Sequence, residues 1–197
     1  MEISAGQVKE LRARTGAGVM DCRNALTEAR GDLEIAQQLL RAKGLAAAAR
    51  KSGRVAKEGM VTSYIHGEGR LGVLVEINCE TDFVARTQDF RTLARDVAMQ
   101  VAASDPRYVT REDVPEDVVA GERAAYLAKA QTESKAGAAA AAAADEQLEK
   151  FFQSVCLLQQ PFIRDQGRTV GDVVKEVVAR TGENIQIRRF ARFRLGE

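Results

Sequence analysis

The 197-residue sequence has no tryptophan, only 5% aromatic residues, a single histidine and three cysteines. The cysteines stand far apart, at positions 22, 79 and 156, so they indicate reduced thiols rather than a disulfide framework or a zinc site. No apolar run is long enough to span a bilayer, and the first residues lack the apolar segment of a secretory signal. We therefore expect a cytoplasmic protein with no membrane association.

An excess of one charge is also absent, because 29 Lys and Arg residues balance 28 Asp and Glu residues to give a net charge of +1. This balance gives no general signature of nucleic-acid binding. The sequence also lacks paired carboxylates in a pocket pattern, a metal-ligand cluster and an activated nucleophile. We expect no enzyme, no cofactor and no metal site, and we expect the function to be a binding event.

The most informative stretch runs from Leu71 to Arg86. It begins with strict alternation, LGVLVEINC, which predicts a strand that buries one face. Thr81 and Asp82 follow, and both residue types cap the start of a helix. Phe83 then falls on the corner between strand and helix. It either folds back into its own core, as most phenylalanines do, or protrudes as an anchor for a partner.

Residues 1–44 predict a three-helix domain. Ser4 and Gln7 fit a capping box, and Asp32 can cap the third helix, which we expect Gly44 to end. Residues 45–58 are rich in alanine and basic residues and predict a helical connector with a break at Ser52.

Residues 59–197 predict an α+β core. The expected strands cover residues 60–66, 71–79 and 185–195, and amphipathic helices are expected after Phe83, before Pro161 and after Thr169. A turn is expected at Gln166-Gly167. In the last strand, Phe193 should share the apolar face, and Arg188, Arg192 and Arg194 the solvent face. Residues 116–144 are helical by propensity, but the alanine-rich part at 136–144 offers little to pack, so we expect this arm to project or to be mobile.

The predicted fold is therefore a three-helix amino-terminal domain joined to a small antiparallel sheet of about three strands, with helices on one face.

Four blocks carry a resemblance to a known family. NCETDFVAR resembles the signature of the elongation factor Ts family, and three further blocks are similar to others of that family in the same order: TGAGVMDCRNAL, CLLQQPFIRD and GENIQIRRFARF. The resemblance implies a ubiquitin-associated-like fold for the three helices. It also implies a guanine-nucleotide exchange factor for elongation factor Tu.

On this resemblance, the corner after the strand enters the GTPase and disturbs its Mg²⁺ and phosphate site, and the second helix makes secondary contacts. The corner residues implied are Thr81, Asp82, Phe83 and Val84. The residues implied in the second helix are Val19, Met20, Asp21, Cys22 and Arg23. Because the chain has the length of a short family member with a single core half, a homodimer is also expected.

Two alternatives remain open. A helical RNA-binding adaptor would use the basic connector with Arg188 and Arg192, although a solvated face is the simpler interpretation of these arginines. A hydrolase would need Cys79 and His66 side by side, and Cys79 alternates with core residues.

Overall fold

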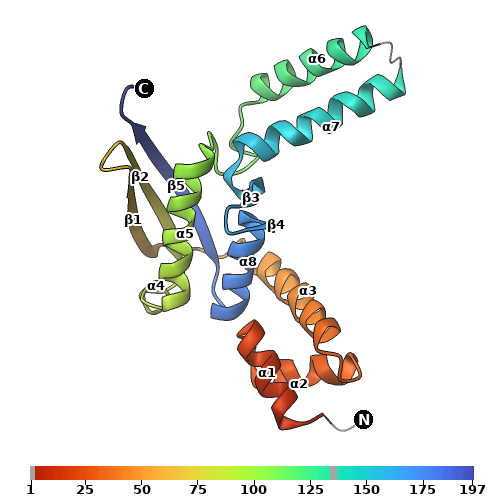
Figure 1. Cartoon of the computed structure of the whole chain (residues 1–197), viewed down its shortest axis with the longest axis vertical. Coiled ribbons are helices and arrows are strands. Elements are labelled where there is room, and N and C mark those ends of the chain that lie inside the picture. The colour runs from red at the N-terminus through yellow and green to blue at the C-terminus, as the bar shows by residue number, and fades with distance from the viewer. Residues whose placement is uncertain (1–2, 134–136) are drawn as a thin grey trace. The chain divides into compact units, whose positions relative to one another are not determined.

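The computed structural model describes residues 3–133 and 137–197, and Figure 1 shows the helices and strands. Residues 1–2 of the predicted helical domain and residues 134–136 of the predicted arm lie outside the described residues. The elements in chain order are α1 (Ala5–Thr15), α2 (Val19–Glu28), α3 (Leu33–Lys51), β1 (Glu58–His66), β2 (Leu71–Cys79), α4 (Asp82–Ala85), α5 (Gln88–Ser104), α6 (Glu116–Thr132), α7 (Ala138–Val155), the 3₁₀ turn η1 (Leu157–Gln159), β3 (Pro161–Phe162), β4 (Asp165–Thr169), α8 (Val170–Thr181) and β5 (Ile185–Arg194). A three-stranded sheet has the order β1-β2-β5, so the predicted α+β class is confirmed.

The chain divides into two compact units. The first comprises residues 1–60, 77–93 and 172–186, and the second comprises residues 61–76, 94–171 and 187–197. The helical amino-terminal region and the corner after β2 belong to the first unit. The α6–α7 pair and most of β5 belong to the second.

The three amino-terminal helices form as their caps predict. Ser4 and Gln7 make the full capping box, Gly16 ends α1 in the left-handed conformation at φ 69°, and the Asp32 carboxylate accepts from the N–H of Ile35 at 2.9 Å. Their shared core consists of Leu11, Cys22, Ala25, Leu26, Ala29 and Ala36. A core this small leaves much of the surface of the helices exposed to solvent.

The expected helix end at Gly44 is wrong, because α3 continues through this glycine to Lys51. A Cβ atom at Gly44 would lie 3.0 Å from the Cβ of Ala179 on α8. The glycine therefore marks a close approach of two helices in the first unit rather than a helix end. The predicted break at Ser52 is confirmed, since α3 ends immediately before it.

The alternation of β2 is confirmed by its burial. Val73, Val75, Ile77 and Cys79 are each at most 1% exposed, whereas Leu74 between them is 48% exposed. Both faces of the sheet thus carry apolar residues, but only one of them is covered within the chain.

The predicted facing of β5 is wrong beyond its midpoint. Ile187 is buried as expected, but Arg188 and Arg189 are both exposed, so the period of two is interrupted. After this interruption the Arg192 side chain is only 11% exposed and Phe193 is 70% exposed. Arg192 therefore does not belong to a solvated face.

The alanine-rich run packs more than the sequence suggests. Figure 1 shows α6 and α7 side by side, and Ala130, Ala140 and Ala144 are at most 4% exposed. Small side chains allow two helices to approach closely, so methyl groups are enough to fill this contact. At the base of the pair, Arg111 binds Glu149 and lies 4.4 Å from the centroid of the Phe152 ring. The projection or mobility of this arm stays a prediction.

The predicted turn at Gln166-Gly167 is also wrong. Both residues lie in β4, which pairs antiparallel with β3 through Phe162 and Asp165. The chain reverses between these paired residues, at positions 163–164.

Candidate functional site

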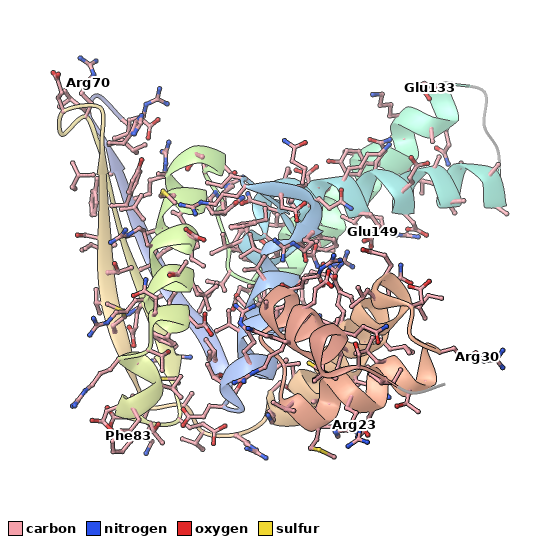
Figure 2. The ribbon with its side chains drawn as sticks, turned by 60° about the horizontal axis from the view of Figure 1, so that its bottom comes forward. Arg23, Arg30, Arg70, Phe83, Glu133 and Glu149 are labelled. Atoms are coloured by element: carbon pink, nitrogen blue, oxygen red, sulfur yellow. The ribbon has the colours of Figure 1, made fainter. Side chains whose placement is uncertain are left out.

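The corner between β2 and α4 presents an exposed aromatic ring. Thr81 has extended φ and ψ angles of −130° and 155°, and its side chain caps α4 by accepting from the N–H of Val84. One residue into α4, Phe83 is 76% exposed, and Figure 2 labels it at this corner. The interpretation that Phe83 folds into its own core is therefore wrong, and its role toward a partner stays a prediction.

The four predicted corner residues do not share one surface. Val84 is 8% exposed and faces the interior, and the Thr81 side chain is occupied in capping. Asp82 is half-exposed and pairs with Arg86 one turn later, at 2.7 Å from Oδ2 to Nη2. Asp82 and Phe83 thus present their side chains at the surface, whereas Thr81 and Val84 shape the turn that carries them.

Two residues that sequence reasoning did not assign to the site hold this corner. The Glu183 carboxylate accepts from the Thr81 N–H at 2.9 Å and from the Thr81 hydroxyl at 2.6 Å. The Glu80 carboxylate in turn accepts from the Asn184 N–H at 2.6 Å. The GEN sequence at 182–184 begins one of the four family-like blocks. That was the available signal, but it gives no indication of which residues these side chains bind.

The buried thiol of Cys79 belongs to the same framework. It is fully buried, and its Sγ donates to the carbonyl oxygen of Thr81 at 3.1 Å. Burial, aided by the nearby Glu183 charge, raises the pKa of Cys79 to about 11. A protonated, inaccessible thiol is a poor nucleophile, so this cysteine gives no support to the hydrolase alternative.

The start of α2 presents a second exposed apolar surface. Val19 is 51% exposed and Met20 is 62% exposed, and Asp21 and Arg23 are also exposed. Cys22, by contrast, is fully buried in the three-helix core. Of the five predicted secondary contacts, Cys22 is therefore not available to a partner.

The first unit also connects the corner to the end of α3. The buried Asn184 side chain donates from Nδ2 to the carbonyl oxygens of Ser52 and Arg54, at 3.2 and 2.7 Å. The Arg54 guanidinium lies 3.5 Å from the Glu80 carboxylate. The end of the helical domain and the Phe83 corner therefore meet at one short segment, residues 182–184.

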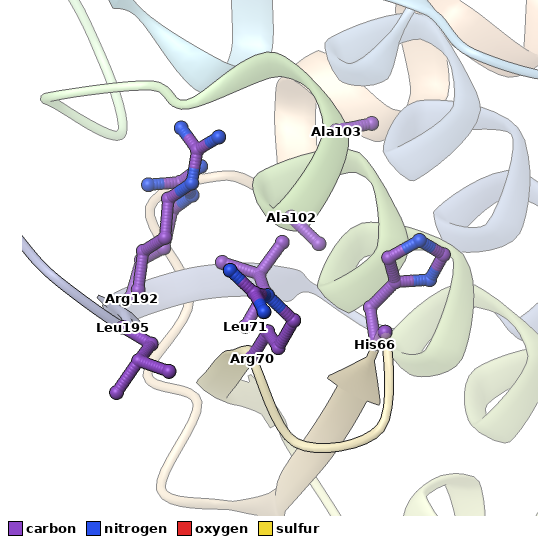
Figure 3. Close-up of a pocket in the computed structure, with 9 residues that line it drawn as sticks. His66, Arg70, Leu71, Ala102, Ala103, Arg192 and Leu195 are labelled. Atoms are coloured by element: carbon purple, nitrogen blue, oxygen red, sulfur yellow. The ribbon is translucent and has the colours of Figure 1, made fainter.

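The second unit holds a basic pocket of about 400 Å³, shown in Figure 3. His66, Arg70, Arg192 and Arg194 line it, but no acidic or thiol side chain does. Arg192 is already paired with Asp105 and Glu197, each at 3.3 Å. This pocket offers no set of groups for acid–base or nucleophilic chemistry.

The described residues also lack two other kinds of site. They contain no group of three or more His, Cys, Asp or Glu side chains placed to hold a metal ion. Within residues 3–133 and 137–197, no helix combines the length and hydrophobicity needed to cross a membrane.

Comparison with known proteins gives consistent matches. The family model described as "Elongation factor TS" matches residues 37–197. The chain is 58% identical over 195 residues to elongation factor Ts of Carboxydothermus hydrogenoformans, covering 99% of this chain and 90% of that protein. It is 57% identical over 195 residues to elongation factor Ts of Moorella thermoacetica, covering 99% and 96%.

Proposed function

The chain belongs to the elongation factor Ts family, and from this premise we propose that it is a cytoplasmic guanine-nucleotide exchange factor for elongation factor Tu. The observation that carries the proposal is the 76% exposure of Phe83 on a corner held by hydrogen bonds. An exposed ring on a fixed backbone suits insertion into a partner. The output is a change in nucleotide affinity, not a chemical reaction.

The mechanism follows from linkage. A GTPase holds nucleotide phosphates on backbone N–H groups at a helix start and on Mg²⁺. A partner that binds best when this site is distorted must weaken nucleotide binding by the same factor by which nucleotide weakens its own binding. We propose that Phe83 enters an apolar gap of the GTPase, that Asp82 acts beside it, and that the resulting shift disturbs the Mg²⁺ and phosphate contacts.

The free energy needed to release nucleotide exceeds what one contact provides. A thousandfold loosening of nucleotide corresponds to about 4 kcal/mol of coupling, whereas burying one Phe side chain contributes about 1.5–3 kcal/mol. We therefore include the α2 surface, with Val19, Met20, Asp21 and Arg23, as the second contact that docks on the GTPase. Its exposed apolar residues support this assignment.

A homodimer is the second part of the proposal. The sheet face that the chain leaves uncovered exposes Val61, Ile65, Leu74 and Phe193, with Leu195 just after β5. A three-stranded sheet with one bare apolar face is marginal alone, and a second copy of the same face would cover it symmetrically. We expect Phe193→Asp to convert a dimer into a monomer in sedimentation equilibrium, while Arg188→Asp on the same strand leaves it dimeric. A wild-type chain that is monomeric at tens of micromolar would contradict this part.

The RNA-binding alternative has less support. Arg54 of the connector lies beside Glu80, and Arg192 is largely buried beside two carboxylates, so neither presents a free basic surface. Arg50 of the connector and Arg188 remain exposed, but a net charge of +1 gives no general signature of nucleic-acid binding. We therefore do not propose direct nucleic-acid binding.

A nucleotide-release assay tests the main proposal. Elongation factor Tu is loaded with a fluorescent GDP analogue and chased with excess GDP, with and without this protein. We expect release to accelerate by about two to three orders of magnitude at saturation, which is the scale of about 3–4 kcal/mol of coupling. A release rate unchanged at tens of micromolar protein would overturn the proposal.

A further inference from the structure

Segment 182–184 lies where the Phe83 corner, the connector and the link between α8 and β5 meet in the first unit. The family resemblance implies no role for this segment. It contacts the corner through Thr81 and Glu80, and it contacts the connector through Ser52 and Arg54. It is also the link between α8 and β5. Gly182 begins it with a φ of 78°, a conformation that glycine adopts without strain.

We propose that Glu183 and Asn184 are positioning residues that fix the Asp82–Phe83 corner relative to the end of the helical domain. This inference rests on the exchange function proposed above. An inserted side chain displaces groups of its partner only if its own backbone stays in place. A binding site is most effective when supporting side chains hold the contacting groups in position. Neither Glu183 nor Asn184 needs to touch the GTPase.

The contacts of Glu183 suit this role. One carboxylate takes both hydrogens that Thr81 can donate, from its backbone N–H and from its hydroxyl. Because the same hydroxyl oxygen caps α4, the carboxylate orients the cap as well as the backbone that precedes it. Loss of Glu183 therefore frees the first turn of α4, which carries Phe83.

The contacts of Asn184 extend the same framework to the connector. Asn184 is 2% exposed and uses both hydrogens of Nδ2 on two carbonyl oxygens of the bend after α3, those of Ser52 and Arg54. Its backbone N–H meanwhile holds Glu80. The two proposed partner-binding surfaces are thereby kept at a set spacing, which spares the complex the entropy cost of arranging them during binding.

The chain offers a matched control. Asp113 accepts from the N–H of Thr110 at 2.8 Å and from its hydroxyl at 2.9 Å, the same pair of bonds that Glu183 makes with Thr81. Asp113→Ala thus removes equivalent hydrogen bonds from a loop with no proposed contact to the GTPase.

Hydrogen exchange of the free protein gives the first readout. We expect Glu183→Ala to raise amide exchange at residues 81–86 at least tenfold, and Asp113→Ala to leave these residues unchanged. Glu183→Gln should retain most of the protection, because an amide accepts from the Thr81 N–H and donates to its hydroxyl oxygen. Unchanged exchange at 81–86 in Glu183→Ala would overturn the inference whatever the protein does to a GTPase.

GDP release from elongation factor Tu gives the second readout. We expect Glu183→Ala to lower the maximal rate about fivefold to tenfold with little change in the half-saturating concentration, and Glu183→Gln to stay within about twofold of wild type. Because Glu183 acts through Phe83, the double variant Glu183→Ala, Phe83→Ala should be no slower than Phe83→Ala alone. Additive losses would show a role independent of the corner and contradict the inference. A wild-type protein without exchange activity would instead refute the function and leave the hydrogen-exchange result standing.

Discussion

Phe83 and Met20 are exposed to a similar extent, 76% and 62%, but the backbones beneath them are held very differently. The Phe83 corner is tied by side-chain hydrogen bonds from Thr81, Glu183 and the Cys79 thiol. The start of α2 has Gly18 as its N-cap, which makes no side-chain hydrogen bond, and the turn before it is held by nearby residues: the Ala17 N–H donates to the Thr15 hydroxyl at 3.3 Å and the Cys22 thiol donates to the Ala17 carbonyl at 3.7 Å. Similar exposure thus accompanies two kinds of support: the Phe83 corner is braced by residues about 100 positions away, whereas the start of α2 is held by local hydrogen bonds, and we infer that it adapts more easily.

This difference suggests a division of labour. A fixed ring suits the step that distorts a partner, because the deformation is not absorbed by the ring's own support. An adaptable patch suits docking, where small adjustments improve contact.

The largest effect is expected for Phe83→Ala. Losing about 1.5–3 kcal/mol of burial available only in the complex should lower the maximal rate of GDP release by about 10-fold to 150-fold. The free protein should keep its melting temperature, since an exposed ring stabilises it little. Stopped-flow release and calorimetry measure the two effects. A folded variant with normal release would remove the ring from the mechanism.

A smaller and different effect is expected for Met20→Ala. If α2 docks rather than deforms, losing about 1 kcal/mol of contact should raise the half-saturating concentration about fivefold and leave the maximal rate within about twofold. Ile35→Ala, which shortens an exposed aliphatic side chain on α3, serves as the control. A fall in maximal rate comparable to that of Phe83→Ala would erase the proposed contrast.

The smallest effect concerns the support of the corner at alkaline pH. The folded pKa of Cys79 is raised from 9.0 to about 11, so its thiol form, which donates to Thr81, contributes stability below about pH 9. That contribution is lost as pH rises toward about 11, when a thiolate forms near Glu183. Wild-type protein should therefore lose melting temperature more steeply across this range than Cys79→Ala.

Burial also raises the pKa of Cys156 to about 11. Its effect on the melting temperature is the same in wild type and in Cys79→Ala, so it cancels in the comparison. Equal slopes for wild type and Cys79→Ala would show that this thiol does not support the corner.

The pattern of neighbouring residues in the sequence predicts much of this architecture. The alternation of β2 predicts which residues it buries, and the Thr81 cap predicts where α4 begins, because both depend on neighbouring residues only. Local pattern leaves the exposure of Phe83 open, since burial of a side chain depends on which other segments cover it.

The features that local sequence pattern did not predict depend on contacts between distant segments. Gly44 predicts a helix end by local pattern, whereas in the structure it allows α3 to approach Ala179. The period of β5 is interrupted at Arg188 and Arg189, and this reversed the predicted facing of Arg192 and Phe193. The corner's own support came from Glu183 and Asn184, whose partners no local pattern indicates.

The separation between Thr81 and Glu183 is 102 residues, and that between Glu80 and Asn184 is 104. During synthesis, the aromatic corner is therefore made about 5–20 s before the side chains that brace it, at typical elongation speeds. Throughout that interval the nascent polypeptide carries a loose apolar loop rather than a wedge. On the proposed function, competence to act on a GTPase is then acquired late, when the carboxy-terminal strand has been made and has closed the sheet.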